Sequence, residues 1–181
     1  RICDKVLNNR DKICSVQSKY CEDADFVIVS YGAPVRSASE AVEKARAIIE
    51  EKNPNLEDKE KTAESVGVGA VVFSALWNNR IKDIVFSYDK VLNFDGETAP
   101  YVQYTYARSK SALRKGGDYD LNNIDFSAIL DDEGYEVVKS VLTFGDSVKQ
   151  AAKLREPCVV TRHIVDLAEK FNRFYIGHRI V

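Results

Sequence analysis

The apolar positions of this 181-residue chain follow a helical period over most of its length, after one strand-like run. Residues 25–32, DFVIVSYG, form a continuous apolar run that is closed by glycine, as in a strand buried on both faces. The next segment predicts an amphipathic helix that ends at Asn53, before a proline, with Ser37 and Glu40 as a capping box at its start. Its apolar stripe consists of Ala41, Ala45, Ile48 and Ile49. We therefore expect one β-α unit at the beginning of the chain.

Residues 66–77, VGVGAVVFSALW, are almost entirely apolar. Their two glycines lack the third glycine of a phosphate-binding loop, and no clear strand precedes them. We interpret the segment as a buried helix whose glycines allow close packing. Residues 78–97 carry turn signals at both ends and fit no single period, which indicates short irregular or strand-like pieces.

From Thr98 onward the pattern is helical again. Thr98 is a predicted N-cap, Pro100 fits the first turn, and two glycines at 116–117 end the helix. A second helix is expected from Asp131 to Phe144, a break at Gly145, and a short third helix over 146–156. A fourth helix opens at Pro157, and its apolar stripe consists of Val160, Ile164, Leu167, Ala168, Phe171, Phe174 and Tyr175. The predicted fold class is mainly α: a bundle of antiparallel helices preceded by a single β-α unit.

The composition restricts the possible functions. The formal net charge is −2, so nucleic acid would have to bind to a local patch rather than to a global positive field. The four cysteines form no Cys-x-x-Cys pair and there are only two histidines, so we expect no metal site. No apolar run reaches transmembrane length, and we expect free thiols, a cytoplasmic location and no membrane partner.

The chemistry of residues 94–115, FDGETAPYVQYTYARSKSALRK, allows two interpretations. On a helix, Tyr101, Tyr104 and Arg108 lie along one side, and tyrosines beside a guanidinium can stack unpaired bases while the cation meets phosphate. Alternatively, the tyrosines pack in the bundle with their hydroxyl groups at its edge. The residue pattern alone favours the second interpretation.

The same segment carries a family resemblance. Asp95, Gly96, Thr98, Pro100, Tyr101, Gln103, Tyr104 and Arg108 match a pattern that is specific to arginyl-tRNA synthetases. The segments GVGAVVFSALWNNRIKD and EPCVVTRHIVDLAEKFNRFY resemble the helices before and after it in that family, most closely in bacterial members. The resemblance covers residues 42–178.

This resemblance implies a helical domain that binds the anticodon arm of arginine tRNA. The implied RNA contacts are Tyr101, Gln103, Tyr104, Arg108, Asn172 and Tyr175, with Asn79 and Arg80 at the junction that faces the inner side of the tRNA. The implied domains are a β-α unit over 1–53, a helical connector over 54–97 and a truncated anticodon-binding bundle over 98–181. We expect the chain to be a monomer or to associate weakly with itself through an uncovered apolar face.

The catalytic signatures of that family are missing. No His-Ile-Gly-His motif is present, and a chain without methionine cannot carry the usual Lys-Met-Ser-Lys loop. The family uses ATP with magnesium, but we assign this chain no catalytic residue and no cofactor, and expect it to be inactive alone. Residues 1–46 also resemble the α-type subunit of 2-oxoacid:ferredoxin oxidoreductases, through the stretch YCEDADFVIVSYGAPVRSASEAVEKAR. The alternative hypothesis is therefore a mosaic or artificial chain without a selected activity.

Overall fold

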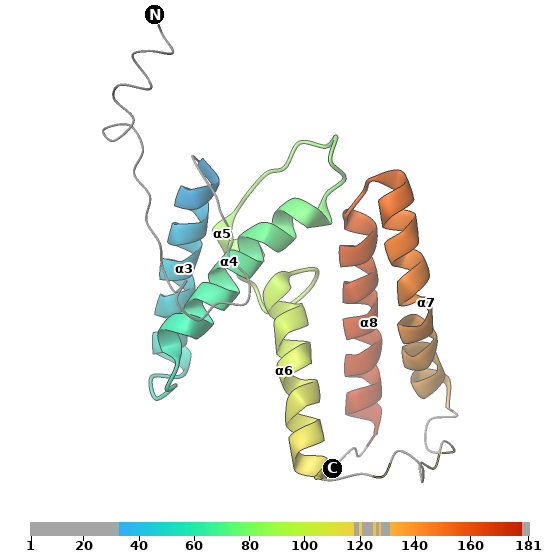
Figure 1. The fold of residues 1–181 in the computed structure, drawn as a ribbon. Helices are drawn as coiled ribbons and strands as arrows, with labels where there is room; N and C mark the ends of the chain where they lie inside the picture. Colours follow the sequence, from blue (N-terminus) through green and yellow to red (C-terminus); the bar gives the residue numbers. More distant parts are fainter. Residues whose placement is uncertain (1–32, 118–119, 121–124, 126, 128–130, 179–181) are drawn as a thin grey trace, which may run out of the picture. The chain divides into compact units, whose positions relative to one another are not determined.

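The computed structural model describes residues 33–117, 120, 125, 127 and 131–178 (Figure 1). These residues contain six α-helices and no strand, and the helices belong to one compact unit that begins at Ala33. The mainly helical fold class is confirmed. The strand expected over residues 25–32 lies outside the described residues, and the division into three domains stays a prediction.

Helices α3 (Ala33–Lys52) and α4 (Lys59–Trp77) pack against each other and form the apolar core of the first half. Ala45 and Ala63 are almost fully buried there, and Ala41 is buried on the predicted stripe. Gly67 is also buried, and a Cβ atom at this position would lie only 2.5 Å from the backbone nitrogen of Val42. The absence of a side chain at Gly67 therefore allows the two helices to pack closely, as the sequence predicted.

The predicted capping box of α3 is wrong. The helix begins at Ala33, so Ser37 and Glu40 lie inside it rather than at its start. A proline at position 34 is tolerated in a first helical turn because its missing N–H group would have no intrahelical partner there. The predicted end of the helix is correct, since it stops at Lys52.

Residues 78–98 connect the core to the second half. They contain only the single-turn helix α5 (Tyr88–Val91), in agreement with the irregular structure predicted for this segment. Leu92 is buried with Ala70 in the α3–α4 core, which fixes the connection. Thr98 then caps α6 (Ala99–Gly116): its Oγ1 atom accepts a hydrogen bond from the Tyr101 backbone N–H, and Gly117 ends the helix with a φ of 69°.

The predicted break at Gly145 is wrong. Helix α7 (Asp132–Leu154) runs through this residue, and a Cβ atom there would meet nothing within 4 Å. One exposed glycine costs a helix only about 1 kcal/mol, and packing against α8 along the helix offsets that cost. The helix ends instead at Arg155, which adopts the left-handed conformation that closes many helices.

Helix α8 (Cys158–Gly177) lies between α7 and α6, and α6, α7 and α8 stand side by side in Figure 1. The predicted antiparallel packing holds for α7 and α8. Helices α6 and α8 run in the same direction, because α7 returns the chain to the end from which α6 began. The most buried positions of α8 are shifted from the predicted stripe, because α8 packs against helices on two sides: they are Cys158, Thr161, Val165, Ala168 and Asn172.

Candidate nucleic-acid interface

A guanidinium between two aromatic rings forms the centre of the candidate site. The Cζ atom of Arg108 on α6 lies 4.6 Å from the ring centroid of Tyr104 and 5.1 Å from that of Tyr175 on α8. Both distances are within the range of cation–π attraction. The Nη2 atom of Arg108 also donates a hydrogen bond of 2.7 Å to the hydroxyl oxygen of Tyr104. The two helices thus bring together side chains that are 67 residues apart in the sequence.

Asn172 on α8 contacts this arginine from the buried side. Its Oδ1 atom accepts a hydrogen bond of 2.8 Å from the Nη1 atom of Arg108. Its Nδ2 atom donates to the hydroxyl oxygen of Tyr101 at 3.0 Å and to Oγ1 of Thr105 at 2.8 Å. We call these six residues the α6–α8 cluster: Tyr101, Tyr104, Thr105, Arg108, Asn172 and Tyr175. One amide therefore connects three side chains of α6.

The α6–α8 cluster is buried at its base and open at its rim. Asn172 and Thr105 are 9% and 7% exposed, whereas Tyr104 is 50% exposed. Tyr101, Arg108 and Tyr175 are half-buried. Within the described residues, the hydrogen-bond partners of the guanidinium are an amide oxygen and a phenol oxygen rather than a carboxylate, so its charge is not neutralised by an ion pair. A base or a phosphate could thus approach a fixed cation between aromatic surfaces.

Gln103 lies on another side of α6, at the contact with α4. Its Nε2 atom donates a hydrogen bond of 3.0 Å to the backbone oxygen of Ser65. A Cβ atom on Gly69 would lie 2.8 Å from that Nε2 atom, so the glycine makes room for the amide. The Oε1 atom of Gln103 is buried without a hydrogen-bond partner among the described residues. The structure therefore separates Gln103 from the other expected contacts.

Asn79 and Arg80 follow the end of α4. The guanidinium of Arg80 forms an ion pair with Glu156 at 3.1 Å, and its backbone N–H donates to the same carboxylate. Glu156 directly precedes the first turn of α8, whereas Tyr175 lies in its last turn. Asn79 accepts a hydrogen bond from the backbone N–H of Ile81. These two residues therefore belong to the opposite end of α8 from the cluster.

The end of α8 that carries Tyr175 is anchored by His178. The imidazole donates to the backbone oxygen of Phe174 at 2.9 Å and to a carboxylate oxygen of Asp131 at 2.6 Å. The backbone hydrogen bond to Phe174, followed by the bond to Asp131, raises the pKa of His178. The pKa of Asp131 is lowered, mainly because its carboxylate accepts a hydrogen bond from the backbone N–H of Gly134. This ion pair connects the start of α7 to the end of α8.

Thr105 is the member of the cluster that the sequence interpretation missed. The helical period shows which residues share a face of one helix. It does not show which residue of another helix lies opposite them, so it could not pair Thr105 with Asn172. The signal available was a small polar residue between Tyr101 and Arg108, on the same face of α6 as both.

The described residues contain no group of histidine, cysteine, aspartate and glutamate side chains that could hold a metal ion. Among the same residues, no helix is both long and apolar enough to cross a membrane.

Comparisons with known proteins match two segments of this chain to domains of tRNA synthetases. Residues 102–181 match the DALR anticodon binding domain, and residues 35–88 match the catalytic domain of class I tRNA synthetases of the arginine type. Two curated relatives are arginine–tRNA ligases. The protein from Halothermothrix orenii is 46% identical over 79% of this chain, and the protein from Alkaliphilus metalliredigens is 50% identical over 78%. The chain spans about a quarter of the length of these relatives, 25% of each.

Solved structures agree with the sequence relatives. The Thermus thermophilus arginyl-tRNA synthetase is similar with a TM-score of 0.74 and 39% identity, over 80% of this chain and 24% of that chain. The Plasmodium falciparum arginyl-tRNA synthetase has a TM-score of 0.67 and 26% identity, over 79% of this chain and 26% of that chain. From residue 35 onward, the chain therefore carries a segment of a class I synthetase catalytic domain followed by a DALR anticodon binding domain, and it is homologous to the C-terminal part of arginine–tRNA ligases.

Proposed function

We propose that this chain binds the anticodon arm of arginine tRNA through the α6–α8 cluster. The observation that carries the proposal is the Arg108 guanidinium, which is held between the rings of Tyr104 and Tyr175 and has no carboxylate partner among the described residues. The match of residues 102–181 to the DALR anticodon binding domain supports the assignment of the ligand.

Binding would use stacking and charge together. The half-exposed ring of Tyr104 offers a surface on which an unpaired base of the loop can stack. Such stacking contributes about 1–3 kcal/mol per base. Arg108 adds a fixed positive charge beside it. Because the chain as a whole carries a net charge of −2, this local charge has to act against a slightly negative protein.

The proposal is tested by measuring the affinity of the chain for the anticodon stem-loop of arginine tRNA, by fluorescence anisotropy. We expect binding that weakens with salt, and a loss of about tenfold or more in affinity for Tyr104→Ala, as for a lost stacking contact. Arg108→Ala should weaken binding and lower the slope of log affinity against log salt by about 0.7. A wild-type chain that binds the stem-loop no better than an unrelated RNA hairpin would refute the proposal.

Matched control variants lie on other helices. Tyr135 on α7 is 60% exposed and has the cation of Lys139 beside its ring, as Tyr104 has Arg108. Arg46 on α3 is exposed and forms an ion pair with Glu60. We expect Tyr135→Ala and Arg46→Ala to leave stem-loop binding within about twofold of wild type, because neither residue belongs to the cluster.

We further propose that Arg80 and Asn79 are secondary contacts for the inner side of the tRNA, that the chain acts in the cytoplasm and that it is inactive alone. Arg80→Ala should then weaken binding of whole arginine tRNA but not of the isolated stem-loop. Equal losses on both RNAs would contradict this assignment.

Weak self-association is part of the same proposal. The exposed side of α7 carries large apolar side chains, of which Val141 is 55% and Leu142 76% exposed. Sedimentation equilibrium should show a monomer with a weak dimer at high concentration, and Leu142→Lys should remove the dimer. A dimer that persists in this variant would mean that α7 is not the contact.

A further inference from the structure

Both polar atoms of the Asn172 side chain are engaged within the cluster. All three of its polar contacts are made within the cluster: Oδ1 accepts from Arg108, and the two hydrogens of Nδ2 are given to Tyr101 and Thr105. The residue is also 9% exposed. We propose that Asn172 and Thr105 do not touch RNA but are positioning residues, which orient the rim of the cluster so that it offers chiefly hydrogen-bond donors. This inference rests on the proposed function.

Thr105 determines which way the Asn172 amide faces. The hydroxyl of Thr105 donates its single hydrogen to the backbone oxygen of Tyr101, at 3.0 Å. Its Oγ1 atom can then only accept, so the amide nitrogen of Asn172 has to face it. The opposite orientation would also place amide hydrogens against Arg108, which has no acceptor. Thr105 and Arg108 thus require the same amide orientation.

The fixed amide defines what the rim can offer to a ligand. The phenol oxygen of Tyr101 accepts from Asn172, and the phenol oxygen of Tyr104 accepts from Arg108, so each phenol hydrogen is available for a ligand. Arg108 uses two of its five N–H groups inside the cluster, and three are left. Such a set of donors favours groups rich in acceptors, namely phosphate oxygens or a base edge with a carbonyl oxygen and a ring nitrogen.

The experiment compares Thr105→Val with Thr105→Ser in the full chain. Valine has nearly the shape of threonine but no acceptor, whereas serine keeps the acceptor. We expect Thr105→Val to lower the affinity for the arginine stem-loop about fivefold, and Thr105→Ser to restore most of it. In the Arg108→Ala background, Thr105→Val should have almost no further effect, because Thr105 acts through the amide on that guanidinium. A role in folding alone would leave the two losses additive.

Two results would overturn the inference while leaving the proposed function intact. One is wild-type affinity in Thr105→Val, and the other is additivity with Arg108→Ala. If the wild-type chain binds no arginine RNA, the proposed function fails, and the inference is then judged by NMR on the free protein. The inference expects a slowly exchanging Asn172 amide signal that is lost in Thr105→Val and kept in Thr105→Ser. An unchanged signal in both variants overturns it.

Modified stem-loops identify the source of the acceptors. If phosphate oxygens are bound, one methylphosphonate linkage in the loop should remove the effect of Arg108→Ala. If a base edge is bound, one abasic position should remove it instead. Either result supports a site that binds its ligand through donors, whereas an Arg108 effect that survives every single modification contradicts it.

Discussion

Two helix contacts within the described residues, α3–α4 and α6–α8, are built on opposite principles. Between α3 and α4 the side chains at the centre of the contact are apolar and small, with Ala45, Ala63 and the missing side chain of Gly67 setting the distance. Between α6 and α8 the most buried groups are polar, with Thr105 and Asn172 linked by a hydrogen bond. The first contact is specified by volume and the second by directional bonds. A directional contact also fixes the orientation of functional groups, which a volume contact does not.

The largest effect is expected at the apolar contact. Gly67→Ala would place a methyl group 2.5 Å from the backbone nitrogen of Val42, and a backbone atom cannot move aside without separating the helices. We expect a loss of about 2–3 kcal/mol in the free energy of unfolding, measured by urea denaturation. RNA binding by the fraction that remains folded should be unchanged. A neutral substitution would show that α3 and α4 are not packed this closely.

The polar contact should respond differently. Asn172→Ala would leave buried groups of Tyr101, Thr105 and Arg108 without their partner, at a cost of about 1–3 kcal/mol. Unlike Gly67→Ala, this variant should also weaken RNA binding under conditions where circular dichroism shows it fully folded. If Asn172→Ala lowered stability but left RNA binding by the folded protein unchanged, the distinction between the two contacts would fail.

A smaller effect of opposite sign is expected at Gly145, the matched control for Gly67. Nothing lies within 4 Å of a Cβ atom at this position, and the helix continues through it. Gly145→Ala should therefore raise the free energy of unfolding by about 1 kcal/mol, measured as a shift of the urea midpoint to higher concentration. A destabilised Gly145→Ala variant would argue that α7 bends or breaks at this residue.

The smallest predicted effect is a pH dependence where His178 at the end of α8 meets Asp131 at the start of α7. The pKa of His178 is raised in the folded state, so its contribution is complete below its ordinary value of about 6.5 and is lost as the pH rises through the raised value. The pKa of Asp131 is lowered, so its contribution is present above its ordinary value of about 4 and lost as the pH falls through the lowered value. Both contributions coincide between about pH 4 and pH 6.5.

Unfolding free energies of wild type and His178→Gln across pH 4–9 check this prediction. The difference between them should be greatest below about pH 6.5 and should shrink at higher pH. A difference that is constant with pH would mean that folding does not change the pKa of His178.

Local sequence chemistry predicted most helix ends, because the determining groups are close together in the chain. Thr98 caps α6, Gly117 ends it and α3 stops at Lys52 for such reasons. Ser37 was wrongly predicted as a cap because α3 already begins at Ala33. Gly145 was wrongly predicted as a break because packing along α7 outweighs the cost of one glycine.

The candidate site was only partly predictable. The period of α6 and the family resemblance brought Tyr101, Tyr104 and Arg108 together with Tyr175. The part played by Thr105 depends on its position opposite Asn172, 67 residues away, and no local pattern contains that information. The different location of Gln103 likewise depends on the space left by Gly69 in another helix.

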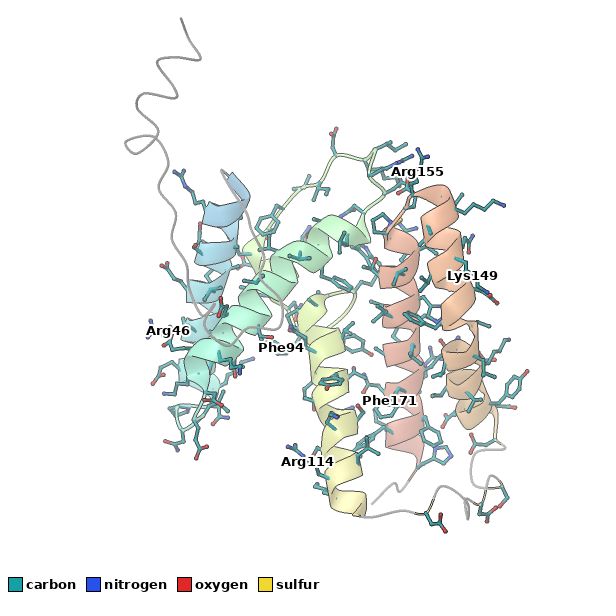
Figure 2. All side chains as sticks on the ribbon, in the orientation of Figure 1. Arg46, Phe94, Arg114, Lys149, Arg155 and Phe171 are labelled. Atoms are coloured by element: carbon teal, nitrogen blue, oxygen red, sulfur yellow. The ribbon has the colours of Figure 1, made fainter. Side chains whose placement is uncertain are left out.

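The common direction of α6 and α8 has an electrostatic consequence. Their carbonyl ends lie at the same end of the bundle, so the negative poles of two helix dipoles add there (Figure 1). Such a field repels a polyanion. The last turn of α6 carries Arg114 and Lys115, with Arg114 on the side of α6 away from α8 (Figure 2), and His178, whose pKa is raised, follows α8. The cations of α6 compensate the paired dipoles, as the proposed RNA binding would require of this end of the molecule.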